Sequence, residues 1–416
     1  MDKTSLITGI TAMLLAALLA FTLTPPVRVL AFRLGAIDVP KDNRRMHKVP
    51  MPRLGGLAIF AGFSITTALF CEYAPVMRAL WLGGLVIMVL GVFDDIYQLN
   101  PMVKFAAQIG ASLIPVLEGV TIDFLGFGGK YFDLGAFSIP VTMLWIIGLT
   151  NAINIIDGLD GLSCGVSAIC SLSLLGVLCS LDPVPAIALP VAILVGSCAG
   201  FLPFNVNPAK IFMGDTGALF LGYTLSVMSI EGVFKVHAAL SFVVPISIFG
   251  LPLFDTLFAF IRRIAKRTNP FKADKLHVHH RLINMGFNVR QSVAILYAVC
   301  GILGISAMLL TDESRIRTVI VVLLGISILL VNYYIFRNPE TRAHSGIDIA
   351  HNGRAAYPGA EIPVHPEDML TDEINPAVTE TDTDINSNTD DKKSDTDKST
   401  ETEKAETIEE AGTDVR

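Results

Sequence analysis

The sequence is poor in the features that hold small soluble domains together. Its six cysteines include no CxxC pair, and all of them lie in or beside apolar stretches. Small buried hydrophobic side chains account for them better than a disulfide framework or a zinc site does. Charge is also scarce, because only 17% of the 416 residues are charged whereas 52% are hydrophobic. This composition is too apolar for an ordinary soluble domain.

The sequence also lacks a convincing internal repeat and a convincing signal-peptidase site. Without a repeat, a transporter built from two inverted halves is disfavoured, though it is not excluded. The first apolar run, Leu6–Leu23, is followed by Pro25 and Pro26, and no clear A-x-A cleavage site precedes them. We therefore expect a retained first membrane span rather than a removed signal peptide.

Long apolar runs dominate the rest of the sequence. Runs of about 17 to 25 apolar residues match the ~30 Å hydrocarbon layer of a bilayer and predict spanning helices. Eleven runs, some of them short, predict an all-α polytopic membrane protein of about eleven transmembrane helices. The runs are 5–24, 54–71, 79–93, 103–119, 138–153, 162–180, 185–203, 216–231, 238–261, 292–310 and 316–336.

The basic residues between these runs predict the orientation. Seven lie in 27–53 and eight in 262–290, so that with Lys104 and Lys210 one set of loops carries 17. The opposite set carries only six, which are Lys3, Arg78, Lys130, Lys235, Arg315 and Arg317. Because basic loops stay in the cytoplasm, we expect a multi-pass plasma-membrane protein with its N-terminus outside.

The end of the chain has a different composition. Between Glu367 and Arg416, 17 acidic and five basic residues give a net charge of −12, against −7 for the whole chain. This part is rich in Thr, Ser and Asn and has no apolar periodicity, which predicts disorder. We expect a polytopic membrane domain over 1–337 and a disordered acidic cytoplasmic tail over 338–416.

Four polar groups interrupt the apolar pattern, and the predicted topology places all four on the cytoplasmic side. They are Asp94–Asp95, NAINIIDGLDG at 151–161, NVNPAKIFMGDTG at 205–217 and LHVHHRL at 276–282. Adjacent carboxylates in apolar surroundings need a cation or a shared proton. A wetted helix end would explain one such pair alone, but it does not explain four convergent groups. We therefore expect an active site on the cytoplasmic face.

Oxygen ligands without thiolates favour Mg²⁺, or alternatively Mn²⁺, over zinc. Such an ion takes only one or two protein oxygens and fills its other positions with phosphate and water, which predicts a phosphorylated substrate. His277 and His280 are three apart, as in some zinc sites, but no further zinc ligand is obvious nearby. Contacts to phosphate or sugar suit this basic segment better. Attraction to anionic lipid explains the arginines at 262–263 but not three histidines.

Spacing gives further hints. Asn151, Asn154 and Asp157 are three residues apart, so on a helix they lie roughly along one face. Phe212 could stack on a base, although such an aromatic is more often part of the packing. Asp255 is a further acid in an apolar run, and we interpret it as structural and outside the site.

These motifs resemble those of the bacterial polyprenyl-phosphate N-acetylhexosamine-1-phosphate transferases. This group belongs to glycosyltransferase family 4 and is related to phospho-N-acetylmuramoyl-pentapeptide translocase. The resemblance covers about residues 1 to 336. It rests on five motifs in family order: HKVPMPRLGG at 47–56, DD at 94–95, NAINIIDGLDG, NVNPAKIFMGDTG and HVHHRL. The HxHHR form looks like the N-acetylglucosamine branch of the family.

The resemblance implies catalytic and metal-binding roles for five residues. Asp94 and Asp95 match the aspartate pair near the lipid phosphate, and Lys104 matches a lysine near the catalytic groups. Asn154 and Asp215 match positions that hold Mg²⁺. Asp215 is thus expected to act in catalysis as well as in metal binding.

The resemblance also implies a set of substrate-binding residues. Asp157, Asn205 and Phe212 match positions that contact uridine. The loop that meets the diphosphate and the sugar corresponds to His279, His280 and Arg281. Asn151 and Asp160 complete the set, and we expect them to support their neighbours.

The implied reaction joins UDP-N-acetylglucosamine (UDP-GlcNAc) and undecaprenyl phosphate to give undecaprenyl-diphosphate-GlcNAc and UMP. This is the first membrane step of a cell-wall or surface polysaccharide pathway. Direct attack by the lipid phosphate is preferred over a covalent aspartyl intermediate, but the sequence does not separate the two. Other UDP-N-acetylhexosamines, UDP-N-acetylmuramoyl-pentapeptide and, in another class, cation-coupled transport are the alternatives. No nucleic-acid partner is expected, and the sequence does not decide whether the chain forms a homodimer.

Overall fold

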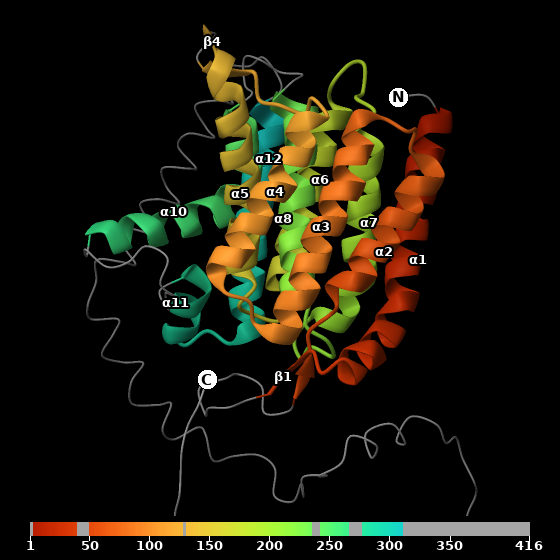
Figure 1. Ribbon diagram of the computed structural model, residues 1–416, viewed down its shortest axis with the longest axis vertical. Helices are drawn as coiled ribbons and strands as arrows, with labels where there is room; N and C mark the ends of the chain where they lie inside the picture. The colour runs from red at the N-terminus through yellow and green to blue at the C-terminus, as the bar shows by residue number, and fades with distance from the viewer. Residues whose placement is uncertain (1–2, 40–49, 128–129, 235–241, 266–276, 311–416) are drawn as a thin grey trace, which may run out of the picture. The chain divides into compact units, whose positions relative to one another are not determined.

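The computed structural model describes residues 3–39, 50–127, 130–234, 242–265 and 277–310. Over these ranges the chain is a bundle of helices (Figure 1). The helices are α1 (Lys3–Arg33), α2 (Gly56–Phe70), α3 (Pro75–Tyr97), α4 (Pro101–Leu117), α5 (Ser138–Ile156), α6 (Leu162–Cys179), α7 (Ala188–Asn205), α8 (Gly214–Ser229), α9 (Val243–Ile248), α10 (Gly250–Ala265), α11 (Val278–Asn284) and α12 (Val289–Leu310). The predicted span 316–336 and the predicted tail 338–416 lie outside the described residues, so the division at 337 stays a prediction.

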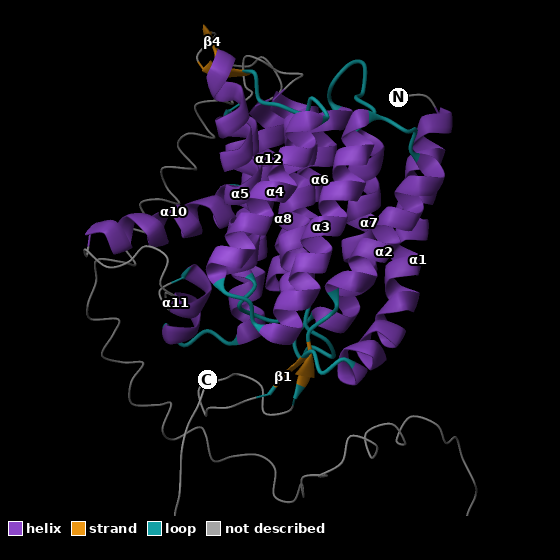
Figure 2. Ribbon diagram, in the orientation of Figure 1, coloured by secondary structure: helices purple, strands orange, loops and turns teal. Residues whose placement is uncertain are grey.

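Two short antiparallel strand pairs accompany the helices, and the sequence did not predict them. β1 (Ile37–Asp38) pairs with β2 (Met51–Pro52), and β3 (Phe124–Phe127) pairs with β4 (Lys130–Asp133). The pairs lie at opposite ends of the bundle, with β4 at the top of Figure 1 and β1 at the bottom (Figure 2). Both lie in connections between helices, so the part of the chain with membrane-spanning character is all-α.

Seven described helical segments are long and apolar enough to cross a membrane by length and composition. They are α1, α3, α5 with the 3-10 turn before it (Gly135–Phe137), α6, α7, α8 with the π-helical turn after it (Ile230–Phe234), and α12. Two shorter apolar helices, α2 and α4, lie between them in sequence. Nine of the eleven predicted runs thus coincide with a helix, and the multi-pass α-helical class is confirmed.

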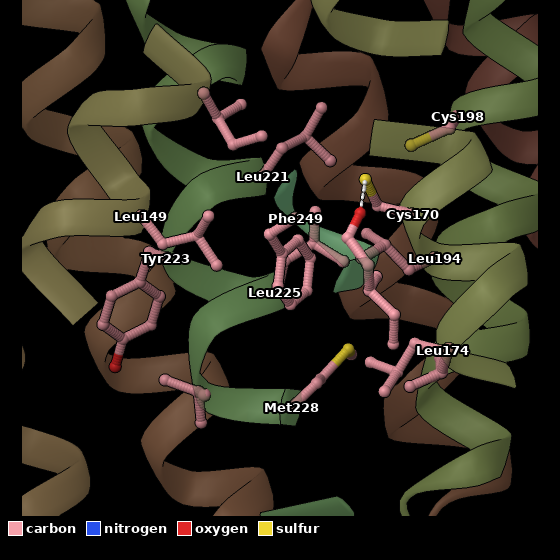
Figure 3. Close-up of a cluster of buried hydrophobic side chains, with 14 of the residues drawn as sticks. Leu149, Cys170, Leu174, Leu194, Cys198, Leu221, Tyr223, Leu225, Met228 and Phe249 are labelled. Atoms are coloured by element: carbon pink, nitrogen blue, oxygen red, sulfur yellow. Dashed lines mark hydrogen bonds between the residues drawn. The ribbon is translucent and has the colours of Figure 1, made fainter. Parts of the chain in front are cut away.

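The prediction of one continuous span over 238–261 is wrong. Helix α9 ends at Ile248, and α10 begins at Gly250 and extends sideways from the bundle (Figure 1). Pro252 has no backbone N–H, so it cannot donate to the Ile248 carbonyl four residues earlier. That carbonyl accepts a hydrogen bond from the Cys170 thiol instead, with Sγ 3.2 Å from the oxygen (Figure 3). Apolar composition alone does not reveal this break.

Helix α8 forms the centre of the bundle. Every one of its residues except Asp215 is buried. Figure 3 shows Leu221, Leu225 and Met228 among side chains of the surrounding helices. Because its residues are buried within the protein itself, other helices rather than lipid cover α8. The Asp215 side chain, which is 20% exposed, is therefore the point at which α8 reaches solvent.

Two glycines bring neighbouring helices close to the start of α8. A Cβ at Gly56 of α2 would overlap the backbone of Gly217, and a Cβ at Gly91 of α3 would overlap the backbone of Thr216. Side chains at these positions would push the helices apart. The place of Asp215 in the protein thus depends on two residues that have no side chain.

Candidate active site

The carboxylate of Asp95, near the end of α3, caps helix α8 across the bundle. Its Oδ1 accepts a hydrogen bond from the backbone amide of Asp215 at 3.0 Å. Its Oδ2 accepts bonds from the amide of Thr216 at 3.0 Å and from the Thr216 hydroxyl at 2.7 Å. The first amides of a helix have no partner within the helix and carry partial positive charge, so a carboxylate there is stabilising. Asp95 thereby fixes the position of Asp215.

The neighbouring carboxylate, Asp94, has a different environment. Its Oδ1 accepts the amide of Leu99 at 2.9 Å, and its Oδ2 contacts the ammonium group of Lys104. The same ammonium group lies 2.9 Å from Oδ2 of Asp215. Lys104, on α4, therefore bridges carboxylates of α3 and α8. Two carboxylates sharing one ammonium group form a compact charged cluster at the ends of three helices.

Arg53 belongs to this cluster, although it is absent from the predicted site. Its Nε lies 3.6 Å from Oδ1 of Asp95, and a terminal nitrogen lies 4.0 Å from Oδ1 of Asp215. Burial opposes the charge of the guanidinium, but the surrounding carboxylates, first Asp95 and then Asp215, together outweigh burial and raise its pKa. The sequence signal that could have identified Arg53 was its place in the motif HKVPMPRLGG. In the structure it follows strand β2 directly.

The backbone joins this motif to FMGDTG. The amide of Phe212 donates to the Pro52 carbonyl at 2.8 Å, and the amide of Gly55 donates to the Phe212 carbonyl at 3.0 Å. The amide of Gly56 donates to the Met213 carbonyl at 2.9 Å. These bonds pair two motifs that are far apart in sequence. They place Arg53 beside Asp215 independently of either side chain.

Asn151 links two helices. Its Nδ2 donates to Oε1 of Gln108 at 2.7 Å and to the Ile147 carbonyl at 2.8 Å. Gln108 lies one helical turn after Lys104 on α4 and is buried. The Asn151–Gln108 pair thus connects α4 to α5 next to the charged cluster. No sequence signal identified Gln108 as part of the site, because it is an isolated Gln in an apolar helix and lies outside the five motifs.

The two aspartates of NAINIIDGLDG differ in their surroundings. The Asp157 side chain keeps partial exposure, but the protein packed around it and the charge of Asp215 raise the pKa of its carboxyl to about 8. Asp160 instead accepts bonds at Oδ2 from Nδ2 of Asn207 at 2.9 Å and from the amide of Ala209 at 3.1 Å. Asp157 therefore interacts with the charged cluster, whereas Asp160 organises the loop before α8.

The other residues predicted in this region have mixed environments. Asn154 lies one turn before Asp157, whose amide donates to the Asn154 carbonyl at 3.2 Å. Asn205 is buried, and its Nδ2 donates to the Ile211 carbonyl at 3.1 Å, so it shapes its own loop. Phe212 is half-buried, and its backbone joins the pairing with the 52–56 segment.

The predicted histidines lie on the short helix α11. His279 is only 2% exposed, and its ring packs so closely on Gly158 that a Cβ there would overlap Nε2. The His279 and His280 ring centroids are 4.3 Å apart. Burial and then the charge of His280 lower the pKa of His279 to about 4, so its imidazole is neutral at pH 7. Arg281 follows His280 on α11 and is partly buried.

No group of three or more His, Cys, Asp or Glu side chains that could hold a metal ion occurs among the described residues. The oxygens of Asp215 and Asn154 are nevertheless hard donors without competing thiolates. They fit Mg²⁺ that is held by one or two protein oxygens together with substrate phosphate and water.

The structure thus joins Asp94, Asp95, Lys104 and Asp215 directly and adds Arg53 to them. They meet at the ends of α3 and α8, close to the β1–β2 pair at the bottom of Figure 1. Two carboxylates held by one lysine, with an arginine beside them, suit a substrate that carries phosphate groups.

The sequence profile of glycosyl transferase family 4 matches residues 77–233. Over 310 residues the chain is 42% identical to a protein of Bacillus subtilis described as a probable undecaprenyl-phosphate N-acetylglucosaminyl 1-phosphate transferase. That match covers 73% of this chain and 86% of the relative. The chain belongs to glycosyl transferase family 4. Membership in the family confirms the resemblance seen in the sequence.

Two further relatives show how wide the similarity is. A decaprenyl-phosphate N-acetylglucosaminephosphotransferase of Mycobacterium tuberculosis is 36% identical over 330 residues, covering 71% of this chain and 80% of the relative. An undecaprenyl-phosphate alpha-N-acetylglucosaminyl 1-phosphate transferase of Escherichia coli K12 is 26% identical over 319 residues, covering 74% and 86%. The matched parts exceed the profile match and span most of each relative.

Proposed function

We propose that this protein transfers N-acetylglucosamine 1-phosphate from UDP-GlcNAc to undecaprenyl phosphate and releases UMP. The observation that carries the proposal is the bridge that Lys104 makes between Asp94 and Asp215, with Arg53 alongside. The names of the relatives support both the sugar phosphate and the polyprenyl acceptor. The product would enter a cell-wall or surface polysaccharide pathway as its first membrane-bound intermediate.

The reaction forms one phosphorus–oxygen bond and breaks another. An oxygen of the lipid phosphate attacks the sugar-linked phosphorus of UDP-GlcNAc, and the bond to the bridging oxygen breaks. UMP leaves with the electron pair of that bond. Negative charge grows on the bridging oxygen, so the cations Lys104 and Arg53 would stabilise the transition state more than the substrates. Direct attack needs no covalent intermediate, and we prefer it for that reason.

The aspartates divide into two roles in this proposal. Asp94 would keep the lipid phosphate deprotonated, since its carboxylate lies in the cluster and is not used to cap a helix. Asp95 would act indirectly, by holding Asp215 at the start of α8. The sequence-based expectation gave both residues the same place beside the lipid phosphate. The hydrogen bonds of Asp95 support a positioning role instead.

Asp215 and Asn154 would hold Mg²⁺, or alternatively Mn²⁺, together with the diphosphate. Bound there, the ion would supply positive charge opposite the diphosphate oxygens. Lys104 already donates a hydrogen bond to Oδ2 of Asp215, so Lys104 and the ion would both interact with this carboxylate. Mn²⁺ binding measured by electron paramagnetic resonance with UMP present should weaken in Asp215→Asn and in Asn154→Ala. Unchanged binding in both variants would contradict these ligands.

Substrate recognition would fall to the surrounding motifs. Asp157, with its raised pKa, can donate a hydrogen bond to a nucleobase carbonyl as a neutral acid. The segment of His279, His280 and Arg281 would meet the diphosphate and sugar through the partly exposed His280 and Arg281, with the buried ring of His279 supporting them. Phe212 remains a candidate for contact with uridine. The bonds of Asn151, Asp160 and Asn205 to other protein groups support indirect roles for these residues.

The decisive assay measures UMP release by purified protein with a panel of UDP-sugars, with and without Mg²⁺. We expect UDP-GlcNAc to be the best donor, ahead of other UDP-N-acetylhexosamines and of UDP-N-acetylmuramoyl-pentapeptide. Asp215→Asn should abolish release, and near-normal release in this variant would refute the site. Asp123→Asn, at the β3–β4 end of the bundle, serves as the matched acid-to-amide control and should keep activity.

We also place the site on the cytoplasmic face, because its loops include the most basic segments of the chain. Lys210 is exposed in the loop before α8, and Tyr73 is exposed between α2 and α3 at the other end. In a Cys71→Ser/Cys179→Ser background, which removes both cysteines with exposure at that end, an impermeant maleimide should label Tyr73→Cys in intact cells. Lys210→Cys should react only after the membrane is opened. The reverse pattern would place the site outside.

A further inference from the structure

Asp255 is a buried acid on α10 with both carboxylate oxygens in use. Its Oδ2 lies 3.0 Å from Nδ1 of His277, and its Oδ1 accepts the backbone amide of Val278 at 3.0 Å. Asp255 and His277 are 7% and 6% exposed. When the carboxylate is ionised it only accepts hydrogen bonds, and Nδ1 of His277 is then the donor. A carboxylate buried in an apolar helix is costly unless it is paired in this way.

The pair lies at one end of a row of imidazole rings. The rings of His277 and His279 are nearly parallel, with 5° between their planes and 5.9 Å between their centroids. His279 in turn packs on Gly158, next to Asp157. The row therefore runs from α10 through the start of α11 to the NAINIIDGLDG motif.

We infer that Asp255 and His277 form a positioning pair that sets the histidine segment 277–281 against NAINIIDGLDG. The inference rests on the proposed function, because it assigns this segment to the diphosphate and sugar of the donor. Neither residue needs to touch substrate. Asp255 fixes the ring of His277 and the first amide of α11 at the same time, and both fix where His279 and His280 stand.

The consequences of losing the carboxylate follow from these two bonds. Without it, Nδ1 of His277 and the amide of Val278 would be buried and unpaired. The start of α11 would then shift to regain partners, and His279 would move off Gly158. Binding and turnover of the UDP-sugar should suffer. The lipid acceptor should be unaffected, since its proposed contacts lie at Asp94 and Lys104.

The kinetic test uses Asp255→Ala, Asp255→Asn, His277→Ala and the double variant Asp255→Ala/His277→Ala. We expect kcat/KM for UDP-GlcNAc to fall at least tenfold in each alanine variant, with the KM for undecaprenyl phosphate changed less than twofold. The double variant should be no worse than the worse single variant, because the two residues act as a unit. Additive losses, or equal losses for both substrates, would overturn the pair.

The amide variant and a control sharpen this test. Asp255→Asn keeps the size of the side chain and an oxygen that accepts the amide of Val278. Its NH₂ group, however, faces Nδ1 of His277, so a proton on Nδ1 would point at another donor. It should show a smaller loss of the same kind, and it gives the test where Asp255→Ala does not fold. Thr256→Val, on the same helix and with no hydrogen bond from the side chain to lose, should retain the activity of the unaltered protein.

A second readout needs no activity and separates this inference from the proposed function. Diethylpyrocarbonate modification, followed by mass spectrometry, reports how exposed His279 is. The buried ring should react slowly in the unaltered protein and at least fivefold faster in Asp255→Ala. Equal rates would overturn the positioning pair. Failure of the unaltered protein to release UMP from UDP-GlcNAc would refute the proposed function while leaving this measurement valid.

Discussion

Thr216 donates two hydrogen bonds to one oxygen of Asp95, from its amide at 3.0 Å and from its hydroxyl at 2.7 Å. The two residues are 121 positions apart, on different helices. The other Asp95 oxygen accepts the amide of Asp215 at 3.0 Å. The carboxylate thus substitutes for a local N-cap of α8, which has no side-chain cap of its own.

Asp95→Asn should destabilise the protein, because one of its polar atoms becomes an NH₂ donor facing backbone donors. The unpaired donors should cost about 1–3 kcal/mol of unfolding free energy. Asp94→Asn should change stability much less while abolishing UMP release. Thermal unfolding in detergent, together with the UMP assay, separates the two effects. Equal loss of stability in both variants would contradict the division of roles.

Lys104→Met removes the cation shared by Asp94 and Asp215. The two carboxylates would then repel each other, so we expect activity to fall by roughly 100-fold or more, about 3 kcal/mol in the barrier. The metal should bind more tightly, because Lys104 no longer competes for Asp215. Mn²⁺ titration followed by electron paramagnetic resonance would detect a lower dissociation constant. Weaker metal binding in Lys104→Met would show that lysine and metal do not share this carboxylate.

Stability should fall between pH 6.5 and pH 4 because of His279. Its pKa is lowered to about 4 in the folded protein from an ordinary 6.5, so the unfolded chain binds a proton more readily in this range. The titratable groups that face it are His277, His280 and Asp255. The contribution is fully present above pH 6.5 and decreases by up to about 1.4 kcal/mol per pH unit as the pH falls.

The difference between the unaltered protein and His279→Asn isolates this effect from the carboxylates that also titrate at low pH. Unfolding temperatures measured at half-unit steps from pH 4 to pH 7.5 should show a steeper decline for the unaltered protein. Parallel curves for the two proteins would mean that His279 is not held neutral.

Gly56→Ala should disturb the site through packing alone. Its Cβ would overlap the backbone of Gly217, so α2 and α8 would have to separate, at a cost of about 1–3 kcal/mol. Asp215 lies two residues before Gly217, so it should shift with α8, and UMP release should fall. Gly110→Ala on α4 is the control, since a Cβ there meets nothing within 4 Å. Equal behaviour of the two variants would rule out the close contact.

Much of this protein could be predicted from sequence because the signals are local. Apolar runs long enough to cross a bilayer gave nine of the described helices, and polar residues at their ends gave four motifs. Together with HKVPMPRLGG, those motifs also carried the resemblance to glycosyl transferase family 4, which the relatives then confirmed. The break before α10 escaped prediction because a proline one turn into a helix leaves the apolar run intact. It acts through one missing hydrogen bond.

The sequence by itself determined the helices, the membrane-spanning character and the motif residues, because hydrophobicity and spacing act over a few turns of one helix. Only the tertiary structure decided what each motif residue contacts. It placed Lys104 against Asp215, 111 positions away in sequence, and it placed the Asp95 carboxylate against the first amides of α8. It also brought in Arg53, Gln108 and Asp255. Such contacts depend on which helices pack together and how closely, and glycines such as Gly56 and Gly91 set that distance.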